Sequence, residues 1–204
     1  MARCFAPKRE DANVDKVKEP KGFTIIEDSR EQRPLDFSAF APMGITCERR
    51  KLRTGDYTIA GFERQVIIER KSLNDVVGTL TKGRERFTRE MYDRGAFYPA
   101  KLLVVEASWS QLSHPYDFSM ANPASITNSL FALMMPPTGV QVFCSPSRAA
   151  IAWFIVNYCN MFIHRVTNGS AGMWSAIFAH DAADLAPFND VPQDIGANLK
   201  GIPL

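Results

Sequence analysis

Apolar residues in this chain gather in short runs separated by polar, turn-forming segments. The runs have the length of β-strands and are rich in valine, isoleucine and leucine, which favours buried strands. The predicted strands are residues 23–27, 45–52, 57–60, 66–69, 101–106 and 140–144. The β-branched run at 66–69 is expected to lie centrally in the sheet.

A second set of segments has helical periodicity. Ser72 is followed three residues later by Asp75, a variant of the capping box in which Asp replaces Glu, so a helix is expected to begin there. The other predicted helices are residues 36–40, 83–92, 123–134 and 147–166. Because strands come first and then alternate with helices, the order predicts an α/β domain with a mixed sheet.

Composition places the chain among ordinary globular proteins. Its 204 residues are 46% hydrophobic and 23% charged, which suits one domain with a substantial core. Residues 1–21 are polar and of mixed charge, so a disordered leader is expected there. Residues 167–204 are rich in Gly, Ala, Asp and Pro and have no assigned structure. The folded domain is therefore expected at residues 22–166.

Targeting and membrane signals are not found in the sequence. The first 21 residues contain no apolar run of the kind present in signal peptides, so secretion is not expected. The most apolar stretch, residues 149–163, is short for a membrane span and includes Asn157 and Asn160, so a buried helix is expected. No cysteines form a CxxC pair, and reduced thiols are expected. These features favour the cytoplasm, or the nucleus if the source is eukaryotic.

The net charge of +2 does not by itself indicate a nucleic-acid-binding protein. Any affinity for DNA must come from local clusters of basic residues. One cluster, at Lys82, Arg84 and Arg86, surrounds the predicted helix at 83–92 and is suited to phosphate contacts that do not depend on base sequence. The alternative is a solvated helix of mixed charge.

Candidate chemistry is concentrated in two nearby motifs, Gly55-Asp56 and Glu69-Arg70-Lys71. Strand side chains alternate between faces, so Glu69 and Lys71 are expected on one face and Arg70 on the other. If the strands at 57–60 and 66–69 form a hairpin, Asp56 and Glu69 converge beside Lys71. Two carboxylates there favour Mg²⁺ or Mn²⁺ binding. The alternative is a surface cluster of salt bridges.

Several separated motifs together resemble the nuclease domain of the XPF family of structure-specific endonucleases. The signature of that family is Gly-Asp, a variable gap, Glu-Arg-Lys, three residues and Asp, and the match extends over about residues 23–166. The motifs that carry the resemblance are Asp28-Ser29-Arg30-Glu31, Gly55-Asp56-Tyr57, Glu69-Arg70-Lys71, Asp75 and Gly83-Arg84.

The resemblance implies a restriction-endonuclease-like mixed central sheet flanked by helices. It also implies a DNA endonuclease that depends on Mg²⁺ or Mn²⁺ and cuts branched or junction-containing DNA in repair, recombination or replication. The implied metal ligands are Asp56, Glu69 and Asp28, and the implied catalytic lysine is Lys71. The remaining implied residues are Arg70 and Asp75 in the catalytic motif, and Arg30, Glu31 and Arg84 in DNA binding. Lys82 and Arg86 are expected to bind DNA because they belong to the basic cluster.

Each of the flanking residues has a structural alternative. Asp75 is also suited to capping its helix, and Asp28 to forming a turn at the end of its strand. Arg70, which is expected to face away from Glu69, is also suited to a salt bridge between the sheet and a helix. The further alternatives are a mutual ion pair between Arg30 and Glu31, and a solvated Arg84.

The chain departs from the family in one respect. Relatives that cut branched DNA usually carry tandem helix-hairpin-helix motifs, which residues 167–204 do not contain. A stand-alone nuclease domain is therefore expected, and flap or fork specificity stays open.

The helix at 147–166 is apolar on more than one side. This pattern favours a homodimer or heterodimer through C-terminal helices only slightly over a monomeric core. The competing functions are a non-catalytic DNA-binding or partner subunit and a protein-interaction module that does not bind DNA.

Overall fold

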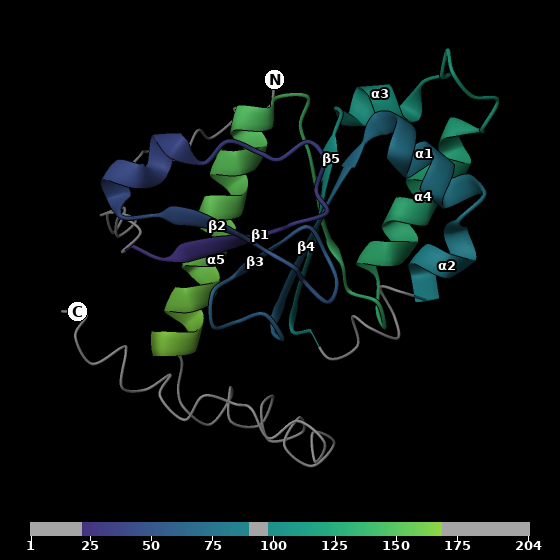
Figure 1. The fold of residues 1–204 in the computed structure, drawn as a ribbon. Helices are drawn as coiled ribbons and strands as arrows, with labels where there is room; N and C mark the ends of the chain where they lie inside the picture. The colour runs from purple at the N-terminus through teal and green to yellow at the C-terminus, as the bar shows by residue number, and fades with distance from the viewer. Residues whose placement is uncertain (1–21, 90–97, 169–204) are drawn as a thin grey trace, which may run out of the picture.

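A six-stranded mixed sheet with helices on both faces forms the centre of the molecule (Figure 1). The computed structural model describes residues 22–89 and 98–168, and the order of strands within this part is β2-β1-β3-β4-β5-β6. The strands are β1 (Thr24–Asp28), β2 (Thr46–Arg50), β3 (Tyr57–Ile59), β4 (Val66–Ser72), β5 (Ala100–Glu106) and β6 (Gln141–Cys144). The predicted α/β fold with a mixed sheet is confirmed, and β4 is an inner strand as expected.

Strand direction follows from the connections between the strands. β3 pairs antiparallel with both β1 and β4, while β1 pairs parallel with β2. β4, β5 and β6 are parallel to one another, which requires crossover connections, and helices supply them. The helices are η1 (a 3-10 helix, Ser38–Met43), α1 (Leu73–Thr81), α2 (Arg84–Arg89), α3 (Trp109–Ser113), α4 (Pro123–Met134) and α5 (Arg148–Asn168).

Two hydrophobic cores lie on opposite faces of the sheet. One packs the sheet against α5, and the other packs it against α1, α3 and α4. β4 contributes to both cores, because Val66 and Ile68 point toward α5 while Ile67 points toward α1. The same alternation continues past the core: Glu69 and Lys71 follow Ile67 on the α1 face, and Arg70 follows Ile68 on the α5 face.

Some predicted elements have different bounds in the structure. The helix expected at 36–40 is the 3-10 helix η1, because the Asp36 carboxylate accepts a hydrogen bond from the Ser38 N–H (2.8 Å) and forms a turn before the helix begins. β4 continues to Ser72 rather than ending at Glu69. α3 was not predicted, although Ser108 and Gln111 form a complete capping box at its start.

Other predictions fall outside the described residues or remain predictions. The disordered leader at 1–21, residues 90–92 of the helix expected at 83–92, and nearly all of the 167–204 extension lie outside that part of the chain. None of the helices described is long and apolar enough to cross a membrane. α5 packs one face against the sheet and leaves Trp153 57% and Met161 49% exposed. Dimer formation through this helix stays a prediction.

Candidate active site

A tight turn before β3 fixes the position of Asp56. Gly55 in this turn has a φ of +76°, and a Cβ atom there would lie 2.8 Å from Ile67 Cγ1 and 3.1 Å from the Ile68 carbonyl oxygen. Only glycine tolerates both the backbone angle and the close approach. Asp56 then donates its N–H to the Ile68 carbonyl (2.8 Å) and accepts from the Asp28 N–H (2.8 Å), so its backbone is held between β1 and β4.

The Asp56 carboxylate lies beside β4. Its Oδ2 atom accepts a hydrogen bond from the Arg70 backbone N–H at 2.7 Å. Burial, with the nearby Glu69 carboxylate as the next cause, raises the pKa of Asp56 to about 7. The carboxylate is therefore in a place where negative charge is poorly compensated by the described protein atoms.

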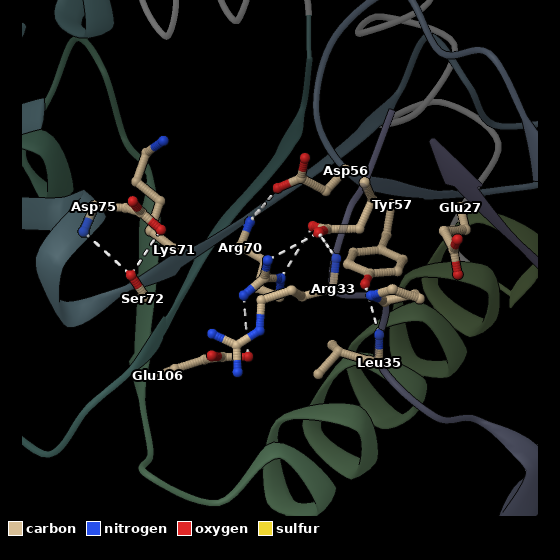
Figure 2. Close-up of polar contacts among 12 residues, drawn as sticks. Glu27, Arg33, Leu35, Asp56, Tyr57, Arg70, Lys71, Ser72, Asp75 and Glu106 are labelled. Carbon is tan, nitrogen blue, oxygen red and sulfur yellow. Dashed lines mark hydrogen bonds and ion pairs between the residues drawn. The ribbon is translucent and has the colours of Figure 1, made fainter. Parts of the chain in front are cut away.

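Glu69 and Lys71 meet on the same face of β4. Lys71 Nζ donates to Glu69 Oε1 at 2.9 Å, and the ammonium lies 5.1 Å from the centre of the Phe87 ring, within cation–π range. Figure 2 shows Asp56 and Lys71 directed to one side of the strand, away from the Arg70 side chain. The predicted β3–β4 hairpin thus brings Asp56, Glu69 and Lys71 to one site.

Arg70 lies on the opposite face in a buried network of ion pairs. Its Nε and Nη2 atoms donate to the two carboxylate oxygens of Glu31 at 3.0 and 2.9 Å, and its Nη1 is 3.1 Å from Glu106 Oε1 (Figure 2). Arg148, the first residue of α5, pairs with the same Glu106 carboxylate. The Arg70 side chain is only 8% exposed. Arg70 therefore pairs with Glu31 after β1 and with Glu106 at the end of β5, and the network reaches a helix only through the Glu106–Arg148 pair.

Asp28 is fully engaged in hydrogen bonds at the end of β1. Its Oδ1 atom accepts from the N–H and Nε of Arg30 (2.7 and 2.9 Å), and its Oδ2 accepts from Arg30 Nη2 (2.7 Å) and the Leu52 N–H (2.9 Å). The Arg30 hydrogen bonds are the main cause that lowers the pKa of Asp28 to about 2. A carboxylate offers about four acceptor positions, so the geometry favours the turn-forming role for Asp28 over metal binding.

Arg30 and Glu31 each form an ion pair with another residue. Arg30 pairs with Asp28, and Glu31 pairs with Arg70, which favours these two pairs over a mutual Arg30–Glu31 pair. Glu31 is buried in the network, and Arg30 also donates to the Leu52 carbonyl at 3.0 Å. DNA contacts by Arg30 and Glu31 stay predictions.

Asp75 and the basic residues Lys82, Arg84 and Arg86 come after β4 in the chain, and they lie in different surroundings. Asp75 donates its N–H to Ser72 Oγ (3.2 Å), and the Ser72 hydroxyl donates to Asp75 Oδ2 (2.6 Å), which favours a capping role for both. Arg84 donates to the Leu80 carbonyl (3.0 Å) and to Ser125 Oγ (3.1 Å), so it joins the start of α2 to α4 instead of pointing to the site. Lys82 and Arg86 line a hollow together with Lys71.

Comparison with known families identifies the protein family of this chain. A model of the ERCC4 domain matches residues 27–168, most of the chain. The chain belongs to the ERCC4 domain family. This is a family of structure-specific DNA endonucleases, so the resemblance to an XPF-type nuclease domain is confirmed. Among curated proteins, no relative matches the ERCC4 chain.

Solved structures show the same fold for this ERCC4 domain. XPF from Aeropyrum pernix is similar with a TM-score of 0.55 and 18% identity, over 78% of this chain and 73% of that one. A second structure, XPF from Aeropyrum pernix in complex with DNA, has a TM-score of 0.55 and 19% identity, over 69% of this chain and 65% of that one. At this identity the likeness establishes the fold.

Glu106 and Arg148 were not found by sequence reasoning about the ERCC4 site. Glu106 ends β5, which pairs parallel with β4 and places Ser72 opposite Glu106. The sequence did contain a signal for Glu106, because it is the polar residue at the carboxyl end of a buried parallel strand. Arg148 carries no local signal, because its contacts are with Glu106 and with the carbonyl oxygens of Arg33 (2.8 Å) and Pro34 (2.7 Å), all distant in sequence.

The donor set of the ERCC4 site consists of two carboxylates. Within residues 22–89 and 98–168, no three His, Cys, Asp or Glu side chains are grouped so that they could hold a metal ion. Asp56 and Glu69 are the two carboxylates at the site, and the raised pKa of Asp56 reflects their mutual repulsion as well as burial. Mg²⁺ commonly uses one or two protein carboxylates and takes its other ligands from water and substrate phosphate. The two carboxylates meet that requirement.

Loss of the Asp28 carboxylate is expected to destabilise the ERCC4 fold in a pH-dependent manner. The folded pKa of about 2 is below the ordinary value of 3.8, so the stabilisation is complete above pH about 4 and is lost as pH falls through 2. Asp28→Asn should lower the free energy of unfolding by about 2 kcal/mol at pH 7, measured by urea denaturation. The matched change Asp117→Asn at an exposed position should have little effect. A difference between Asp28→Asn and wild type that stays constant down to pH 2.5 would contradict this account.

Proposed function

We propose that this ERCC4 domain hydrolyses phosphodiester bonds of DNA in a reaction that depends on Mg²⁺ or Mn²⁺. The observation that carries the proposal is the meeting of Asp56, Glu69 and Lys71 on one face of β4, with the pKa of Asp56 raised to about 7. Two carboxylates beside an ammonium are costly to desolvate for structure alone. A site that binds a cation and a phosphate would account for the two carboxylates and the ammonium together.

Asp56 and Glu69 are the residues that would hold the cation. When bound, the cation supplies Lewis acidity toward a phosphate oxygen and lowers the pKa of a coordinated water. The Arg70 N–H holds the Asp56 carboxylate in position. Lys71, held by Glu69 at 2.9 Å, positions the attacking water and offsets the negative charge that develops on the phosphate.

The Arg70 network would keep this part of β4 in place. Glu31 and Glu106 hold the Arg70 side chain on the face opposite to Glu69 and Lys71, and Arg148 pairs with Glu106 in turn. Because side chains of adjacent residues alternate across a strand, fixing Arg70 also fixes the direction of its two neighbours. We assign Arg70 a positioning role. Phosphate contacts are assigned to Lys82 and Arg86 instead.

DNA is the proposed substrate class, and branched or junction-containing DNA is the proposed structure. The family supports this choice, as does the likeness to an XPF structure described as a complex with DNA. Roles in repair, recombination or replication belong to the same proposal. A homodimer or heterodimer through α5 is compatible with it and is not required by the chemistry at Asp56 and Glu69.

The experiment that tests the proposal is a cleavage assay with labelled duplex, flap and four-way-junction DNA. We expect cutting in Mg²⁺ or Mn²⁺, loss of cutting when a chelator is added, and recovery when the metal is restored. If the wild-type chain binds these DNAs but cuts none of them with either metal, the non-catalytic alternative is favoured. If it binds none of them at any salt concentration, the protein-interaction alternative replaces DNA binding.

A further inference from the structure

A hollow runs along α1 from Lys71 to α2. It has a volume of about 600 Å³ and is lined mainly by polar side chains and two glycines. Its charged lining residues are Lys71, Asp75, Lys82 and Arg86, three basic against one acidic. Asp75 is engaged by the Ser72 hydroxyl at 2.6 Å, and Lys71 is the residue assigned above to the reacting phosphate. The hollow is thus continuous with the proposed active site and is net positive.

Lys82 and Arg86 are the exposed basic residues on the wall of the hollow. Across residues 22–89 and 98–168, the salt bridges include no acidic partner for either of them. They stand at the end of α1 and in α2, spaced along the hollow from Lys71. A row of cationic groups along a polar channel is suited to successive phosphates of one strand.

Gly78 lines this hollow and has no structural reason to be glycine. It lies inside α1, where glycine costs about 1 kcal/mol relative to alanine. A Cβ atom added at Gly78 would meet no atom within 4 Å, and its backbone does not have the positive φ that favours glycine. The fold of the described residues would accept a larger side chain there. Glycine in such a place is suited to the close approach of a ligand to the helix backbone.

We propose that one sugar–phosphate strand of the substrate lies in this hollow, against Gly78, with its phosphates on Lys82 and Arg86. The inference rests on the proposed nuclease function and extends it by naming the path of the strand that reaches Lys71. The polar and cationic lining favours a nucleic-acid strand over an apolar partner helix. Gly78 is a binding residue here, since it touches substrate without taking part in the reaction.

The hollow beside it offers an internal control. A second hollow of about 500 Å³ lies between Leu80 and α4, and its lining includes Arg84 and the exposed Ala132. Placing the same side chain in each hollow compares the two paths directly. Gly78→Gln fills the proposed path, and Ala132→Gln fills the other at a position with no proposed role.

The experiment measures binding and cleavage of a labelled four-way junction, with Ca²⁺ for binding and Mg²⁺ or Mn²⁺ for cleavage. Gly78→Gln should weaken binding by about tenfold or more and raise KM, with kcat at saturating DNA nearly unchanged. The melting temperature should be equal to or above that of wild type, because glutamine favours helix. Ala132→Gln should bind like wild type. Lys82→Ala and Arg86→Ala should each reduce the salt dependence of binding by about one unit of slope.

Three results would overturn the inference or its basis, and they are distinguishable. If wild type cuts and Gly78→Gln binds equally well, the strand does not pass over α1 and the nuclease proposal stands. If Ala132→Gln weakens binding instead, the strand follows the second hollow. If wild type neither binds nor cuts any of the DNAs, the proposed function itself fails. A smaller Gly78→Ala change should give an intermediate loss of binding with a higher melting temperature.

Discussion

Replacing Lys71 by alanine or Asp56 by asparagine is expected to lower the rate of metal-dependent DNA cleavage by roughly a thousandfold. Lys71→Ala removes the ammonium that Glu69 holds at 2.9 Å beside the site. Asp56→Asn removes a negative charge from a buried position while it keeps the shape of the side chain. Neither change should unfold the protein, because asparagine still offers an oxygen to the Arg70 N–H and Lys71 lies at the edge of the core.

The matched control for Lys71→Ala is Lys101→Ala. Lys101 lies in β5 opposite Ile67, near the start of β4, two residues before the position of Glu69 and four before that of Lys71. Its replacement should leave cleavage nearly unchanged. The measurement is single-turnover cleavage of the best substrate, with DNA binding recorded in parallel. Cutting that persists at the wild-type rate in both Lys71→Ala and Asp56→Asn would place the active site elsewhere.

Replacing Arg70 by alanine is expected to lower the free energy of unfolding by about 3–5 kcal/mol. The change removes the two hydrogen bonds that Arg70 donates to the buried Glu31 carboxylate, which keeps that from the Arg33 N–H, and it leaves Glu106 with Arg148 alone. Removing one partner of a buried ion pair costs more than the pair contributes, because the remaining charge is still desolvated. Chemical denaturation followed by circular dichroism measures the loss.

Arg50 provides the comparison for this prediction. It lies in the edge strand β2, is half exposed and pairs with Glu48 and Glu63 on the surface. Arg50→Ala should cost at most about 1 kcal/mol, as exposed ion pairs do. Equal losses in the free energy of unfolding for Arg50→Ala and Arg70→Ala would show that the buried network contributes no more to stability than a surface ion pair. A combined Arg70→Ala and Glu31→Gln variant should be less destabilised than the sum of its parts, because the second change removes the unpaired charge.

The part of the site that could be predicted from sequence depends on neighbouring strands. Alternation along β4 placed Glu69 and Lys71 on one face, and the hairpin with β3 brought Asp56 to them. The glycine of the Gly55-Asp56 motif has a local cause too, since its positive φ and its contact with Ile67 permit no side chain. These features follow from strand periodicity and turn chemistry, which act over short distances in the chain.

The roles that sequence could not assign depend on contacts between distant segments. Asp28 was expected to bind metal, whereas its oxygens accept from Arg30 and from the Leu52 N–H, and nothing local in Asp28-Ser29-Arg30-Glu31 indicates which acid takes which arginine. Arg84 and Arg86 are two residues apart in a helix and so face different hollows. Arg148 reaches the network from α5, a long way along the chain.

Binding of Mn²⁺ to the purified protein tests most directly whether Asp56 and Glu69 share one cation. Titration followed by calorimetry or electron paramagnetic resonance should show binding to wild type, loss of that binding in both Asp56→Asn and Glu69→Gln, and its retention in Asp28→Asn and Lys71→Ala. Equal Mn²⁺ binding by wild type, Asp56→Asn and Glu69→Gln would contradict the assignment of these two carboxylates as the metal ligands of the site.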